Sequence, residues 1–171
     1  EVIAWATEDV TSVLCSCLAT HALVQQLYGI KRQRLPAKKW GVYPHRITQK
    51  EHPLLRNINT RFDVVHSRYN AVTRAQLEAA GLSILVESYE GGVHMAVSPD
   101  QFRLVYFQGH PEYDTNSLLK EYKREVLRFV AGEIDEYPPH PENYFPETAA
   151  AIADEYQAIV LASQAANTPI P

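Results

Sequence analysis

The chain has 171 residues, of which 46% are hydrophobic and 21% charged, a composition typical of a globular domain with a substantial core. Its formal net charge of -4 excludes the general basic field that holds nucleic acid or an anionic membrane, so we expect neither as a partner. The sequence has no apolar stretch long enough to span a bilayer. The only cysteines, Cys15 and Cys17, are too close for an unstrained disulfide, and two reduced thiols suit the cytoplasm.

The first part of the chain predicts a strand that runs directly into a helix. Residues 10–16 are β-branched and apolar without clear alternation, as in a buried parallel strand. Residues 17–28 have apolar side chains at helical spacing, with Leu18 and Leu27 among those on the expected core face. A cysteine at such a junction is typical of a nucleophile elbow, a turn that exposes the side chain at a helix N-terminus and favours a thiolate.

The remaining elements are predicted in chain order. We expect residues 31–60 to be mainly connecting loop, because Pro36, Pro44 and Pro53 interrupt them and their periodicity is poor. Apolar runs bounded by turn residues predict strands over residues 62–66, 82–88, 93–98 and 102–108. Helical periodicity predicts helices over residues 73–80, 115–131 and 148–166.

A nucleophilic thiol at Cys17 needs a base, and two histidines compete for that role. His21 lies one turn later on the same helix, where a side chain points away from the substrate side, so we interpret it as packing or polar lining. His110 follows a predicted strand at its carboxyl end, and Glu112 could orient its ring. Purely structural roles stay open at this point: Cys17 could be a small buried hydrophobic residue, and His110 could be a structural residue.

Other polar residues are candidates for binding a ligand. Ser67 and Arg68 follow the strand over residues 62–66, and an arginine can clamp a carboxylate with two parallel hydrogen bonds. Arg124 lies on an amphipathic helix and Lys38 in a basic loop, where a surface salt bridge and simple solvation are the ordinary explanations. Cys15-x-Cys17 has no second ligand pair at zinc-like spacing, so we expect no metal.

A series of motifs in a fixed order resembles the homoserine O-succinyltransferase family. The matching residues are Thr11-Ser12, Cys17, Tyr28-Gly29-Ile30, Lys38, Gly41-Val42-Tyr43-Pro44-His45, His52-Pro53-Leu54-Leu55, His66-Ser67-Arg68-Tyr69, Gly109-His110-Pro111-Glu112-Tyr113-Asp114 and Asn143-Tyr144-Phe145-Pro146. The resemblance implies an α/β fold of the flavodoxin-like, class I glutamine-amidotransferase-like kind, with helices flanking the sheet and the elbow at Cys17.

The resemblance also implies a function and a set of site residues. Cys17 would accept an acyl group from acyl-CoA, with succinyl-CoA preferred over acetyl-CoA, and pass it to homoserine in methionine biosynthesis. His110 would be the general base and Glu112 its partner, while Lys38, Ser67, Arg68 and Arg124 would bind substrate. Acyl-CoA would be a co-substrate, so no cofactor is expected, and we expect a cytoplasmic homodimer.

The resemblance covers residues 2–146 and only the later half of a family member. We therefore expect residues 1–171 to be the C-terminal part of a single acyltransferase domain, with residues 147–171 a divergent helix and tail and an N-terminal segment missing. Leu18 stands where the family usually has an aromatic residue, and Pro44 where an acidic one is common. Two other functions remain open: a glutamine amidotransferase-type hydrolase, and a non-catalytic regulatory or assembly domain of the same fold.

Overall fold

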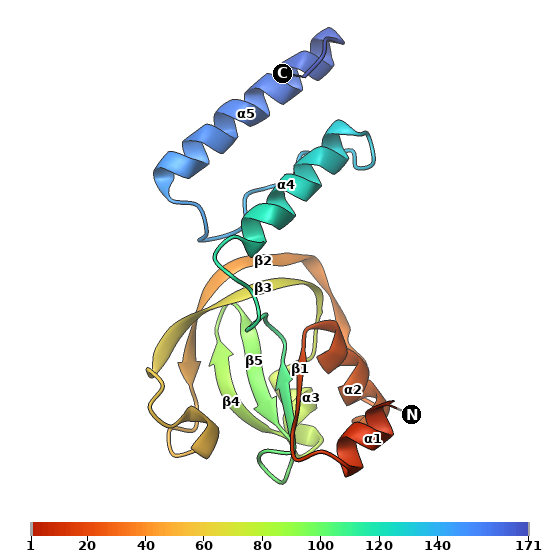
Figure 1. Cartoon of the computed structure of the whole chain (residues 1–171), viewed down its shortest axis with the longest axis vertical. Helices are drawn as coiled ribbons and strands as arrows, with labels where there is room; N and C mark the ends of the chain where they lie inside the picture. Colours follow the sequence, from red (N-terminus) through yellow and green to blue (C-terminus); the bar gives the residue numbers. More distant parts are fainter. Residues whose placement is uncertain (1, 171) are drawn as a thin grey trace. The chain divides into compact units, whose positions relative to one another are not determined.

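A computed structural model describes residues 2–170, so Glu1 and Pro171, the ends of the predicted domain, lie outside the described residues. The chain divides into two compact units, Glu1–Glu112 and Tyr113–Pro171, which are described separately below (Figure 1).

The first unit contains a mixed sheet with helices. In chain order its elements are α1 (Val2–Glu8), β1 (Val13–Ser16), α2 (Leu18–Tyr28), β2 (Gln33–Ile47), the 3₁₀ helix η1 (Pro53–Leu55), β3 (Arg61–Ala71), α3 (Arg74–Ala79), β4 (Ser83–Ser88), β5 (Gly92–Val97) and β6 (Leu104–Phe107). Among the described residues, six strands form one sheet in the order β1-β6-β5-β4-β2-β3. The β1–β6 pair is parallel and the other pairs are antiparallel.

The sheet curls, so that its two ends approach each other. Strands β2 and β3 arch over the shorter strands in Figure 1. Strand β3 is at one end of the strand order, yet its Val65 carbonyl accepts a hydrogen bond of 2.9 Å from the His110 N–H, just beyond β6. This curl brings segments from both ends of the sheet to one place, although they are far apart in the sequence.

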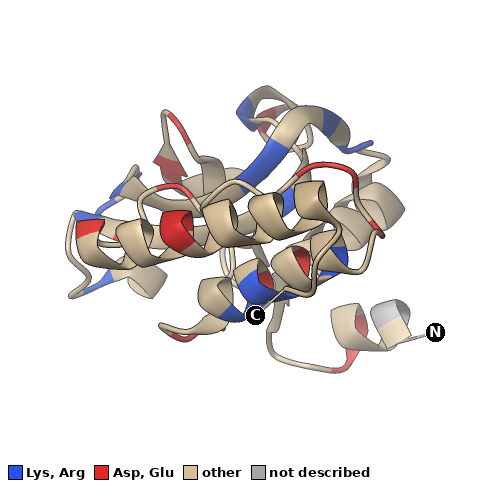
Figure 2. Cartoon of the chain, turned by 90° about the horizontal axis from the view of Figure 1, so that it is seen from above, with Lys and Arg blue, Asp and Glu red and all other residues tan. Residues whose placement is uncertain are grey.

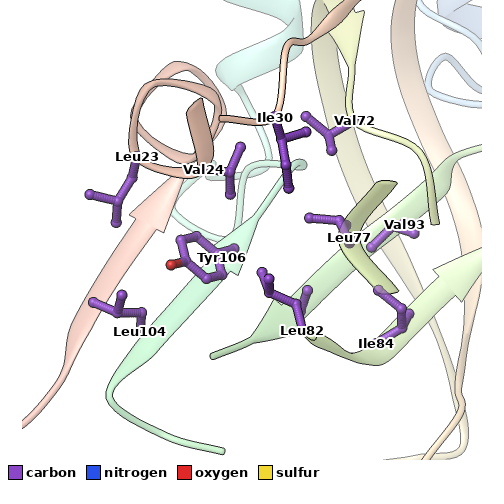
Figure 3. Close-up of a cluster of buried hydrophobic side chains, with 11 residues drawn as sticks. Leu23, Val24, Ile30, Val72, Leu77, Leu82, Ile84, Val93, Leu104 and Tyr106 are labelled. Carbon is purple, nitrogen blue, oxygen red and sulfur yellow. The ribbon is translucent and has the colours of Figure 1, made fainter. Parts of the chain in front are cut away.

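Two hydrophobic clusters cover the two faces of the central strands. One cluster includes Val24 of α2, Leu77 of α3 and Tyr106 of β6, which Figure 3 shows gathered together. The other includes Leu85 of β4 and Val105 of β6. Burial on both faces removes most apolar side chains of these strands from water, the main favourable term in folding. The strands that end near the site are therefore held in a rigid core.

Strand β2 corrects the prediction of a loop over residues 31–60, which was wrong for Gln33–Ile47. The prolines that suggested a loop are tolerated because β2 pairs with β4 only at Arg46 and Ile47. Proline has no backbone N–H to donate, and none is needed along an edge of a strand that has no neighbouring strand. Pro36 lies at the irregularity between Arg34 and Lys39, where the pairing with β3 shifts register.

Two further expectations about side-chain position were wrong. Ser67 and Arg68 do not follow a strand, because β3 continues through them to Ala71. Helix α2 buries Thr20, His21, Leu23 and Val24, whereas Leu18 is 63% exposed. The polar side chains explain the difference: Thr20 Oγ1 lies 2.8 Å from the carbonyl oxygens of both Cys15 and Phe107 and anchors that face of the helix.

The second unit consists of helices α4 (Ser117–Val130) and α5 (Glu147–Ala166), as predicted. The few charged residues of α5 are acidic (Figure 2). Side chains of both helices and of Tyr144 to Pro146 line an apolar groove of about 720 Å³. Across residues 2–170, every helix is too short or too polar to cross a bilayer.

Candidate active site

Cys17 is the single residue that joins strand β1 to helix α2. Its backbone has a φ of 47° and a ψ of -110°, and its N–H donates a hydrogen bond of 2.8 Å to the Phe107 carbonyl. A positive φ is uncommon for a residue with a side chain, and such strain concentrates at functional sites. The strand, strained turn and helix have the order that the sequence predicted for a nucleophile elbow.

His110 and Glu112 lie in the segment that follows β6, beside Cys17. His110 Nδ1 is 2.7 Å from Glu112 Oε1, and the same oxygen accepts a hydrogen bond of 3.2 Å from the Ser16 hydroxyl. The His110 side chain is 11% exposed and that of Glu112 is 51% exposed. The ring is thus enclosed, while the carboxylate that orients it reaches solvent.

The protonation of this pair follows from its contacts. Burial disfavours a charged His110, but hydrogen bonds with Cys17 and Glu112 and the negative charges of both raise its pKa to about 9. Burial likewise opposes the charge of Glu112, but the hydrogen bond with His110 holds the pKa of this carboxyl below its usual value. His110 is therefore an imidazolium at neutral pH.

The structure brings Cys17, His110, Glu112 and Ser67 together. Cys17 Sγ lies 3.9 Å from the Ser67 carbonyl oxygen, and Ser67 is paired with Trp40 across the β2–β3 ladder. Lys38, near the irregularity in β2, places its Nζ 4.0 Å from the centre of the Trp40 ring. The substrate-binding candidates of the first unit therefore lie on adjacent strands, one of which contacts the thiol.

The other two candidates have different surroundings. Arg68 is only 5% exposed, and its guanidinium already donates to groups of the chain. Arg124 lies on α4 in the second unit, where it is exposed and 3.3 Å from Glu125.

His21 and Cys15 have structural surroundings. His21 is 3% exposed and its Nε2 lies 3.1 Å from Gln108 Oε1, which confirms the interpretation of His21 as packing or polar lining. Burial lowers the pKa of His21 despite that hydrogen bond, so the ring is neutral. Cys15 packs against the first hydrophobic cluster, and burial raises the pKa of its thiol.

Sequence reasoning missed several residues that build the site. The Ser16 hydroxyl donates a hydrogen bond to Glu112. A Cβ at Gly109 would lie 2.8 Å from the Val65 carbonyl oxygen, so only glycine allows the two backbone segments to come this close. A group of buried histidines, His45, His66 and His94, was also missed. The spacing of His66 and Arg68 could have indicated that they belong to one cluster, because residues two apart in a strand lie on the same face of the sheet.

No group of three or more histidine, cysteine or acidic side chains within residues 2–170 is arranged to hold a metal ion. The buried Arg68 charge beside the histidines also opposes a bound cation, because like charges repel at short range.

The fold places the chain in a known structural class. Its structure is similar to that of a glutamine amidotransferase from Thermotoga maritima, with a TM-score of 0.58 and 13% identity over 93% of this chain and 61% of the other. A glutamine amidotransferase from Methylobacillus flagellatus matches with a TM-score of 0.57 and 15% identity over 86% of this chain and 57% of the other. These similarities confirm the predicted α/β fold of the class I glutamine-amidotransferase-like kind.

Sequence comparison gives the family within that class. The homoserine O-succinyltransferase family model matches residues 1–159, and the chain belongs to this family. It is 58% identical over 171 residues to a homoserine O-succinyltransferase of Nitrosococcus oceani and 60% identical over 172 residues to one of Methylococcus capsulatus. Both matches cover 100% of this chain and 48% of the relative, so the chain spans about half the length of these relatives.

Proposed function

We propose that the complete protein is a homoserine O-succinyltransferase, which transfers a succinyl group from succinyl-CoA to the hydroxyl of homoserine in methionine biosynthesis. Family membership over residues 1–159, together with a cysteine in a strained turn beside a histidine–glutamate pair, supports this proposal. In this proposal Cys17 is the nucleophile, His110 the acid and base, and Glu112 the residue that orients His110.

The first half-reaction transfers the acyl group to the enzyme. The Cys17 thiolate attacks the carbonyl carbon of the thioester, and the tetrahedral intermediate collapses as the bond to the coenzyme A sulfur breaks. His110 gives its proton to the departing sulfur. The products are a Cys17 acyl-thioester, a neutral His110 and free coenzyme A.

The second half-reaction requires His110 to act as a base, and acylation supplies the change. The interactions with Cys17 that raise the His110 pKa include its negative charge, which disappears when the sulfur is acylated. The pKa of His110 then falls, and its neutral ring can accept the hydroxyl proton of homoserine. The alkoxide oxygen attacks the thioester, Cys17 leaves as a thiolate, and His110 is protonated again.

Substrate orientation is proposed for Lys38, Ser67 and Arg124. Homoserine carries both an amine and a hydroxyl, so the site has to select the hydroxyl. An arginine that holds the carboxylate fixes the hydroxyl near the acyl carbon and keeps the amine away from it. We assign this role to Arg124 because it matches a position that binds homoserine in the family that the sequence resembles.

Replacing Arg124 with methionine is expected to raise the KM for homoserine about tenfold to a hundredfold, because a charge-assisted hydrogen bond is lost. Steady-state kinetics of the full-length enzyme at saturating succinyl-CoA measure this. Arg128→Met, on the same helix, is the matched control and should leave that KM within about twofold. An unchanged homoserine KM in Arg124→Met would remove the residue from the binding site.

We further propose that the enzyme works in the cytoplasm as a homodimer and needs no cofactor besides its co-substrate. Both cysteines are free in the structure, which suits a reducing compartment. Sedimentation of the full-length protein tests the dimer, and a monomer at micromolar concentration contradicts it.

Intact mass spectrometry of the full-length protein tests the function. With succinyl-CoA we expect a succinyl increment on the Cys17 peptide, discharged when homoserine is added. A stable increment from acetyl-CoA alone would change the donor. Release of glutamate from glutamine, with no acyl increment, would favour a glutamine amidotransferase-type hydrolase. No adduct with any of these compounds would indicate a non-catalytic domain.

A further inference from the structure

Positive charge is concentrated in the part of the chain that contains the proposed nucleophile. Between Asp9 and Glu51 the sequence has no acidic residue, although the net charge of the whole chain is -4. The same stretch has seven basic residues, which are Lys31, Arg32, Arg34, Lys38, Lys39, Arg46 and Lys50. Charges of one sign that are gathered in one region attract ligands of the opposite sign. Of these seven residues the proposed reaction uses only Lys38.

A line of aromatic rings and cations leads away from Cys17 along strands β2 and β3. It begins at Ser67, whose carbonyl oxygen lies 3.9 Å from Cys17 Sγ. Ser67 is paired with Trp40 across the β2–β3 ladder. Lys38 Nζ lies 4.0 Å from the centre of the Trp40 ring. These contacts connect the thiol with the basic part of β2.

The line ends at an exposed arginine. Lys38 Nζ lies 5.9 Å from the centre of the Tyr69 ring, and the guanidinium carbon of Arg34 lies 4.7 Å from the same centre. Arg34 is paired with Asn70, three residues along β3 from Ser67 and so about 10 Å from it. Tyr69 is 47% exposed and Arg34 is exposed. The line of side chains therefore leads from the thiol to solvent.

The charge of Arg34 is not balanced by an acidic residue of its own unit. Among the described residues up to Glu112, no carboxylate forms an ion pair with Arg34 or with Lys39. Arg46, near the other end of β2, differs because it lies 2.9 Å from Glu87. An aromatic ring beneath a guanidinium restrains it through the face and leaves the N–H groups at its edge available to a phosphate.

We propose that Arg34, restrained by the Tyr69 ring, binds the phosphate groups of coenzyme A in the acyl donor. An acyl-CoA has its reacting thioester at one end and its phosphates at the other, joined by a long uncharged arm. The line from Cys17 to Arg34 has the same order of groups: the thiol, then a stretch with the Trp40 and Tyr69 rings, then a cation. The inference rests on the proposed use of succinyl-CoA and adds the residues that bind the distant part of this donor.

Donors with and without phosphates test this proposal in the full-length enzyme. Arg34→Met is expected to lower kcat/KM for succinyl-CoA about tenfold, because a charge-assisted hydrogen bond to phosphate is lost. Succinyl-pantetheine has the same thioester and arm but no phosphate, so its kcat/KM should change by less than about twofold. A structural defect, or an Arg34 that binds the succinyl carboxylate, would lower kcat/KM equally for both donors.

Two further comparisons separate this site from the general charge of the surface. Arg61→Met is the same substitution at an exposed arginine at the opposite end of the β2–β3 ladder, and it should change kcat/KM for succinyl-CoA by less than about twofold. Tyr69→Leu removes the ring beneath the guanidinium and should lower kcat/KM about threefold to tenfold. Tyr69→Phe keeps that ring, so its kcat/KM should stay within about twofold of wild type.

Three results would overturn the proposal: a wild-type kcat/KM for succinyl-CoA in Arg34→Met, equal losses with both donors, or an equal loss in Arg61→Met. Calorimetric titration with coenzyme A itself repeats the comparison without turnover, and Arg34→Met should bind it about tenfold more weakly. A wild-type protein that binds coenzyme A but transfers no succinyl group would contradict the proposed function and leave this comparison intact. A wild-type protein that binds no coenzyme A would overturn both.

Discussion

Replacing Cys17 with alanine is expected to abolish succinyl transfer, with turnover reduced by about a thousandfold or more, because no other thiol can form the acyl-enzyme. Cys15 cannot substitute for it. The Cys15 side chain packs in the core, where burial raises the pKa of its thiol, and it precedes the strained turn. Turnover of homoserine with succinyl-CoA, and the mass of the enzyme after succinyl-CoA alone, are the measurements.

Cys15→Ala is the matched control for Cys17→Ala, since it removes the other thiol two residues away. It should keep the acyl increment and most of the turnover, at some cost in stability from the cavity it leaves. An acyl increment that persists in Cys17→Ala would contradict the assignment of the nucleophile. The Cys17→Ala protein should still fold, because alanine and cysteine tolerate the 47° φ equally poorly.

Replacing His110 with asparagine is expected to lower turnover about a hundredfold to ten-thousandfold, the contribution of general acid–base catalysis. Both half-reactions should slow, because His110 supplies a proton in the first and removes one in the second. Glu112→Gln should have a smaller effect, since the amide can still accept a hydrogen bond from Nδ1 but carries no charge. His140→Asn, in the other compact unit, should leave turnover within about twofold.

The raised pKa of His110 predicts that the free energy of unfolding depends on pH. The pKa of His110 in the folded protein, about 9, lies above the ordinary histidine value of 6.5, so the folded state binds this proton more tightly. Its contribution to the free energy of unfolding is therefore complete below about pH 6.5 and is lost as the pH rises through about 9. Urea unfolding at pH 6, 8 and 9.5 measures the decline, which should be smaller in His110→Asn. Equal declines in both proteins would contradict the pairing.

Local sequence signals predicted the elements that local interactions form. Gly29 ends α2 with a φ of 69°, a conformation that glycine adopts without strain. Thr73 and Gln76 form a capping box at the start of α3, so the helix begins where its sequence indicates. The apolar periodicity of α4 and α5 was likewise enough to predict both helices.

The long strand β2 could not be predicted because its partner decides its conformation. Pro36 and Pro44 indicate a turn or a loop in isolation, and an expectation drawn from them follows ordinary turn chemistry. They lie in a strand here because β3 pairs with one edge of β2, while most of the other edge of β2 has no neighbouring strand that needs a hydrogen-bond donor. That information is in residues 61–71 and not in β2 itself.

The sequence alone was enough to predict a nucleophile and a base at the ends of two strands: Cys17 between a strand and a helix, and His110 with Glu112 two residues later. These are short-range features, because turn geometry, helix termini and a histidine–carboxylate pair require only neighbouring residues. The meeting of the two segments, the position of Ser67 beside the thiol and the burial of Arg68 depend on the tertiary structure. The curl of the sheet places these groups together, and it arises from strand pairing and packing across nearly a hundred residues.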